Sequence, residues 1–180
     1  AFIKSMRGSD PDAALYWMAR MLEGGEDPLF IARRMLVLAS EDIGNASPNA
    51  LLIAQATFSA VERVGMPEGR IILAQCAVYL ASQPKSNSSY MGIEKALAYV
   101  RNNKLFSVPL KLRNAPTSLM KNLNYGKDYH YAHDFENHFI LESYLPEEMK
   151  EMQFYFPSEN GQEKSIKERL KLLWKDLKKY

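Results

Sequence analysis

The sequence has one cysteine, Cys76, and no apolar run long enough to cross a membrane. A single cysteine excludes an internal disulfide and fits a reducing cytosol, so we expect a cytoplasmic protein. Because a bilayer span needs roughly 20 consecutive apolar residues, we expect no membrane partner. The first residues also lack the apolar core of a signal peptide. Cys76 itself lies in an apolar run, which favours a buried, inert thiol over a nucleophile.

Motifs of the common catalytic sites are also absent. No P-loop, zinc-finger spacing, nucleophile elbow or dinucleotide fingerprint occurs. Each of these motifs arranges residues around a phosphate, a metal or a reacting atom. We therefore expect no catalytic residue, no cofactor and no metal in this chain. It does not begin with methionine, which predicts a fragment of a longer protein.

Prolines at expected helix starts are the strongest local signal that the sequence does contain. Asp10-Pro11, Asp27-Pro28 and Ser47-Pro48 place a capping side chain before a proline, and Met66-Pro67 repeats the proline without the cap. Proline suits the first helical position because its missing N–H would be unpaired there, and Asp or Ser accepts a bond from a free N–H. Together with apolar periodicity, this pattern predicts helices at 11–23, 28–43, 48–64, 67–81 and 88–102.

These helices predict a mainly α protein, an antiparallel helical bundle over residues 1–102. Residues 35–39 and the centre of the helix at 67–81 are apolar on every side, which is typical of central helices. Short connections favour antiparallel neighbours. We expect residues 103–180 to form a C-terminal extension packed on the same bundle. It contains a short helix at about 116–123, capped by Asn114, and a basic amphipathic helix at 163–179 that docks on protein rather than on a membrane.

Between these two helices, residues 125–156 hold 9 of the 20 aromatic residues and show no helical period. Alternating pieces such as 153–156 are compatible with short strands in a small ribbon. Three histidines and two carboxylates between His130 and His138 offer metal ligands, but their spacing matches no known motif, which favours a structural role. The aromatic rings also suit stacking on single-stranded bases, but the acidic residues around them favour packing against the bundle.

Charge is distributed in blocks, although the net charge is only +2. Residues 95–127 carry seven basic and no acidic side chains, whereas residues 128–163 carry nine acidic side chains and Lys150 alone. Such blocks usually pair with each other, within a chain or between subunits. The alternative is a nucleic-acid-binding module that uses the basic block, with Lys111, Arg113 and Lys121 as its candidate contacts.

Eight strings of residues resemble the C-terminal region of the replication-associated recombination protein A family. These are the MgsA-type AAA+ ATPases, which are related to Werner-helicase-interacting protein and to clamp-loader subunits. The longest string is FIKSMRGSDPDAALYW at 2–17. The others are at 39–46, 64–70, 84–87, 112–117, 125–127, 131–134 and 144–148.

The resemblance implies a clamp-loader-collar-like domain that forms homotetramers. It also implies that ATP and Mg²⁺ are bound upstream, in a DNA-dependent ATPase module whose motifs this sequence lacks, so we expect no enzymatic activity of the fragment. The implied partners of the full-length protein are DNA and single-stranded-DNA-binding protein, in replication, recombination and repair, with a cytoplasmic, nucleoid-associated location. Apolar helices and opposite charge blocks supply the self-complementary surfaces that a symmetric assembly needs.

Overall fold

The structure is a computed structural model that describes all 180 residues. It is mainly α-helical, as predicted, and contains no β-strand. The chain divides into two compact units, which we call unit 1 (residues 1–94 and 155–167) and unit 2 (residues 95–154 and 168–180). A division into domains at residue 102 stays a prediction, because a compact unit is not by itself a domain that folds alone. No helix has the length and apolar character needed to cross a membrane.

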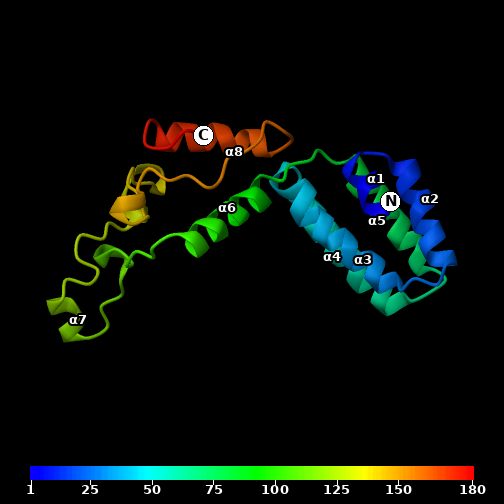
Figure 1. Cartoon of the computed structure of the whole chain (residues 1–180), viewed down its shortest axis with the longest axis horizontal. Helices are drawn as coiled ribbons and strands as arrows, with labels where there is room; N and C mark the ends of the chain where they lie inside the picture. Colours follow the sequence, from blue (N-terminus) through cyan, green and yellow to red (C-terminus); the bar gives the residue numbers. More distant parts are fainter. The chain divides into compact units, whose positions relative to one another are not determined.

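Unit 1 is a helical bundle with α5 at its centre. Its helices are α1 (Phe2–Arg7), α2 (Pro11–Glu23), α3 (Pro28–Leu38), α4 (Asn49–Val64), α5 (Gly69–Ser82) and the first part of α6 (Ser88–Asn102). A π-helical turn, Ala39–Ile43, and a 3₁₀ turn, Gly44–Ala46, connect α3 to α4, which lie side by side in Figure 1. Helix α5 packs against α1, α2, α3 and α4, in agreement with its apolar sequence. Cys76 is buried in α5 as predicted, and burial raises the pKa of its thiol.

Two of the four prolines begin helices in the predicted way. Pro11 and Pro28 occupy first-turn positions, and the carboxylates of Asp10 and Asp27 each accept a first-turn backbone N–H at 2.9 Å. The predicted cap at Ser47 is wrong, because its hydroxyl donates to the Gln83 side chain at 2.9 Å instead. The predicted start at Pro67 is also wrong, because α5 begins at Gly69 after a turn.

Several apolar side chains predicted to be core are exposed. Met35 is fully buried, but Val37 in the same apolar run is 47% exposed. The apolar periodicity that predicts a helix at 88–102 does not mark a buried face of α6, because Ile93 and Val100 are more than half exposed and only Gly92 is buried. A helical period identifies an apolar face, but whether that face is covered depends on which neighbours the fold supplies.

Glu163, the first residue of α8 (Glu163–Trp174), fastens residues 155–163 within unit 1. It is fully buried. Its carboxylate accepts hydrogen bonds from the Tyr155 hydroxyl at 2.7 Å, from the Ser158 hydroxyl and backbone N–H at 2.6 and 3.1 Å, and from the Ser86 hydroxyl. Burial alone raises the pKa of a carboxylate, but these donors outweigh it and hold the pKa of Glu163 below its usual value.

Gly161 allows the backbone to approach the bundle closely at the same place. Its φ is +53°, and a Cβ on it would overlap the carbonyl oxygen of Ala46. That oxygen accepts the backbone N–H of Gln162 at 2.9 Å, and the Asn160 amide donates to the carbonyl of Lys85 at 2.9 Å. The close backbone approach at Gly161 and the hydrogen bonds to the Glu163 carboxylate therefore both attach residues 155–163 to the bundle.

Unit 2 contains the rest of α6, the short helix α7 (Ser118–Asn122), four 3₁₀ turns and the end of α8. The turns are Leu110–Leu112, Ala132–Asp134, Glu136–His138 and Glu147–Met149. The short strands that 125–156 allowed do not form. A strand needs a second strand to complete its backbone hydrogen bonds. Here Phe154 instead packs on Tyr99 of α6, with the two ring centroids 6.0 Å apart.

The predicted ends of the helices in 103–180 also need correction. The Thr117 side chain caps α7 by accepting a backbone N–H at 3.3 Å, so the cap predicted at Asn114 is wrong. Helix α8 ends at Trp174, five residues before the predicted end. Its last turn packs on the aromatic segment, where the Trp174 and Phe139 ring centroids lie 5.5 Å apart.

Candidate functional site

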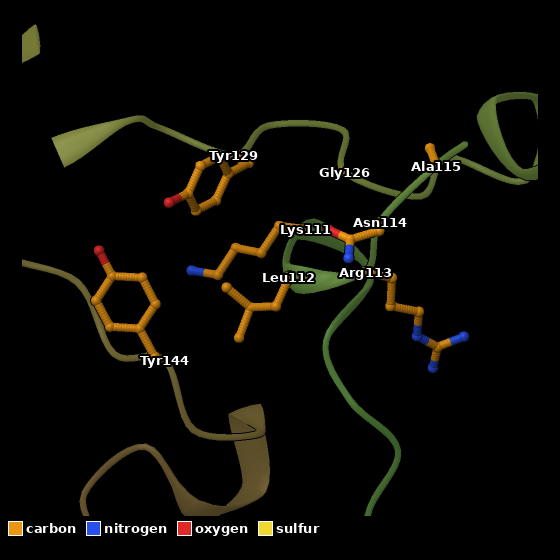
Figure 2. A pocket seen from close by; sticks show the side chains of 8 residues that line it. All are labelled: Lys111, Leu112, Arg113, Asn114, Ala115, Gly126, Tyr129 and Tyr144. Atoms are coloured by element: carbon orange, nitrogen blue, oxygen red, sulfur yellow. The ribbon is translucent and has the colours of Figure 1, made fainter. Parts of the chain in front are cut away.

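The residues predicted to contact nucleic acid lie in or near a pocket of unit 2. The pocket has a volume of about 500 Å³ and is lined by residues 111–115, Gly126, Tyr129 and Tyr144 (Figure 2). The 3₁₀ turn Leu110–Leu112 forms the first part of the pocket wall. The backbone N–H of Gly126 donates to the Leu110 carbonyl at 2.9 Å, which brings together the two ends of the segment 110–126. Gly126 has a φ of +72°, a conformation that glycine adopts readily.

Lys111 is the central charge of this pocket. Figure 2 shows its side chain extending toward Tyr129 and Tyr144, and its ammonium lies 5.9 Å from the centroid of the Tyr144 ring. The ammonium donates to Glu142 Oε2 at 3.1 Å and to the backbone carbonyl of Ser143 at 3.3 Å. Because Glu142 belongs to the acidic block, pairing between the blocks, the interpretation favoured by the sequence, is confirmed at Lys111.

Arg113 points away from Lys111 (Figure 2). Its guanidinium donates to the Val108 carbonyl at 2.8 Å and to the Tyr125 hydroxyl at 3.2 Å, and it lies 5.1 Å from the centroid of the Tyr125 ring. Lys121 is exposed on α7 and is not among the residues that line the pocket. The structure therefore places Lys111 and Arg113 on one loop with different partners and leaves Lys121 apart; their contact with nucleic acid stays a prediction.

Sequence reasoning missed the two tyrosines of the pocket and the carboxylate that pairs with Lys111. In the sequence, nothing but membership of an aromatic, acidic segment distinguishes Tyr129, Glu142 and Tyr144. The interleaving of aromatic and charged residues was the available signal, but it does not show which of them face the basic loop. That depends on the long-range contact of Lys111 with residues 142 and 143.

Exchanging Lys111 for methionine is expected to destabilise the protein by about 1–2 kcal/mol, because the half-buried Glu142 loses its cation while its Oε1 already lacks a partner. Lys121→Met removes an exposed lysine and serves as the control, with a change within about 0.5 kcal/mol. Urea unfolding followed by circular dichroism measures both. Equal midpoints for the two variants would contradict a stabilising role of the ion pair.

The histidines of the aromatic segment contact one another and the backbone. The rings of His133 and His138 lie 4.8 Å apart, and His138 Nδ1 lies 3.3 Å from the carbonyl oxygen of His133. His130 Nδ1 is 3.9 Å from Glu142 Oε2. No group of three or more His, Cys, Asp or Glu side chains is placed to hold a metal ion.

A second hollow lies on unit 1 and is mainly apolar. We call it the α3 groove; it has a volume of about 610 Å³ and lies between α3 with its π-helical turn, α4 and the start of α6. Its walls include Leu36, Val37, Ser40, Leu51 and Ile93, and its only charged side chain is Glu41. The lining also holds the hydroxyls of Ser40, Ser89 and Tyr90, but it includes no histidine or lysine that could activate them. Its mainly apolar walls suit contact with another apolar surface.

Comparisons with known proteins agree with the resemblance found in the sequence. The family model described as MgsA AAA+ ATPase C terminal matches residues 8–174. Replication-associated recombination protein A of Coxiella burnetii is 51% identical over 171 residues, which are 94% of this chain and 39% of that protein. The Escherichia coli K12 protein of the same name is 50% identical over 171 residues, with shares of 94% and 38%. ATPase WRNIP1 of Dictyostelium discoideum is 47% identical over 156 residues, with shares of 86% and 18%. The chain thus spans about two fifths of the length of the bacterial relatives.

Proposed function

Because the chain belongs to the MgsA AAA+ ATPase C-terminal family, we propose that it is the assembly domain of a longer AAA+ ATPase that acts in replication-associated recombination. In this proposal the chain joins copies into a homo-oligomer, a tetramer, and performs no catalysis itself. ATP, Mg²⁺ and the ATPase activity belong to the part of such proteins that this chain does not cover. The resemblance supports DNA and single-stranded-DNA-binding protein as partners of the full-length protein, in repair as well as recombination, and a cytoplasmic, nucleoid-associated location.

The observation that carries this proposal is the exposure of large apolar side chains on the helices of unit 1. The group includes Val37, Leu51, Leu52, Tyr90 and Ile93, each of them at least 40% exposed. Burying such a side chain fully is worth about 1.5–3 kcal/mol, and large contiguous apolar patches on a protein mark interaction sites. Contact with other copies of the chain would bury these side chains.

Light scattering coupled to size exclusion tests the assembly directly. At micromolar concentration we expect a mass several times that of the 20.6 kDa chain, with four copies as the proposed number. A mass of one chain at every concentration would contradict the proposal.

Binding of single-stranded nucleic acid by the basic block is the second candidate function. The observation that favours it is the proximity of cations to rings: the Arg113 guanidinium lies 5.1 Å from the Tyr125 ring centroid and the Lys111 ammonium 5.9 Å from that of Tyr144. Such combinations of cations and rings are typical of single-strand sites. Arg113→Ala and Lys121→Ala are each expected to weaken binding and to lower the slope of log affinity against log salt by about 1. Fluorescence anisotropy of a labelled oligonucleotide measures both quantities. Unchanged affinity and slope in both variants would remove this candidate.

A further inference from the structure

We propose that two copies of this chain dock by the same face of unit 1, the α3 groove, with α3 of one copy antiparallel to α3 of the other. The inference rests on the proposed assembly function and names the surface that carries it. The occupant of the groove is therefore the same groove of a second copy.

The face formed by α3 and the π-helical turn that follows it carries a cation, an apolar residue and an anion in that order. Val37 lines the groove and is 47% exposed. Arg34 lies about one turn before it and is exposed, and Glu41 lies about one turn after it in the π-helical turn Ala39–Ile43. Spacings of three and four residues place side chains on the same face of a helix.

This order makes the face complementary to itself. When two such helices run antiparallel with Val37 near a two-fold axis, Arg34 of each copy faces Glu41 of the other. Leu51 and Ile93, on the other walls of the groove, extend the apolar centre, and both are exposed in a single copy. An apolar centre with charges at its margin is the usual anatomy of a protein interface.

Arg34 and Glu41 are also the charges of this face that the fold itself uses least. Arg33, the neighbour of Arg34, forms an ion pair with Asp27 at 3.3 Å, whereas Arg34 forms none within the chain. Glu41 lies 3.8 Å from Arg7, but Arg7 makes its short contact, at 2.6 Å, with Asp42. Both charges therefore remain available to a second copy.

Two charge reversals test the two-fold arrangement. Arg34→Glu gives a face with two acidic ends, and Glu41→Arg gives a face with two basic ends. We expect each variant alone to show a smaller assembly mass than the unaltered chain, because like charges meet at both ends of the interface. An equimolar mixture of the two variants is expected to recover the full mass, because every contact in a mixed pair is attractive. Light scattering measures the masses, and circular dichroism confirms that each variant keeps its helix content.

Val37→Asp tests the apolar centre, and Ile71→Asp is its matched control. Ile71 is 62% exposed on α5 and does not line the groove. We expect the assembly mass to fall for Val37→Asp and to stay unchanged for Ile71→Asp. If Val37→Asp lowers the mass but the reversals do not, the antiparallel register is overturned. If the unaltered chain assembles and none of the groove variants changes its mass, the groove is overturned while the assembly function stands. A monomeric unaltered chain overturns both.

Discussion

Replacing Glu163 by alanine is expected to destabilise the protein by about 3–5 kcal/mol, a large share of the stability of a domain of this size. The carboxylate is fully buried and accepts hydrogen bonds from Tyr155, Ser158 and Ser86. Its removal takes away the acceptor that these donors share, and a buried donor that loses its acceptor costs about 1–3 kcal/mol. The truncation also opens a cavity where α8 begins. Urea unfolding followed by circular dichroism measures the loss.

The control for this variant is Glu62→Ala, which removes an exposed glutamate from α4 and is expected to change the stability by no more than about 0.5 kcal/mol.

The Glu163→Gln variant tests how the contribution of the charged carboxylate to stability depends on pH. The folded-state pKa of Glu163 lies below that of the unfolded chain, so the contribution of the charged form is present above the unfolded value, about 4.3, and is lost as pH falls through the lower folded value. The difference in the free energy of unfolding between the unaltered protein and Glu163→Gln is therefore expected to become smaller in acid. A difference that stays constant through the acid range would show that the charge of Glu163 does not contribute to stability.

Features of the fold that depend on near neighbours in the sequence could be predicted from it. Asp10 and Asp27 accept N–H groups only two or three residues away. The bounds of α2 (Pro11–Glu23) and α6 (Ser88–Asn102) agree with the prediction. The cap at Ser47 failed because the partner that its hydroxyl found, Gln83, is 36 residues away. Local patterns contain no information about such a competitor.

The same limit applies to the buried carboxylate and to the candidate site. In the sequence Glu163 is one of nine acidic residues in a block and the first residue of an amphipathic helix, which is a solvent-exposed position in most proteins. Its burial depends on Ser86, 77 residues earlier. Lys111 was identified by its place in a basic block, but its partner Glu142 is one acidic residue among several. Block patterning predicted that the charges pair, and only the folded chain shows which of them do.

Replacing Gly161 by alanine is expected to cost about 2–4 kcal/mol, because two independent penalties meet at one residue. The φ of +53° is unfavourable for any residue with a Cβ. In addition, the new Cβ would overlap the Ala46 carbonyl and the ring of Pro84, so the backbone has to withdraw. Withdrawal lengthens the hydrogen bond from Gln162 to Ala46 and moves the start of α8 away from its position.

Gly25→Ala separates the two penalties. Gly25 also has a positive φ, +84°, but no atom lies within 4 Å of the position of its Cβ. Its substitution therefore costs only the conformational term, about 1 kcal/mol. The difference between the two variants in urea unfolding measures the overlap at Ala46, which is the contact that holds residues 155–163 against the bundle. Equal losses of stability for the two variants would mean that residues 155–163 move to accommodate the Cβ at no cost in free energy. The attachment of these residues to the bundle would then depend on Glu163 alone.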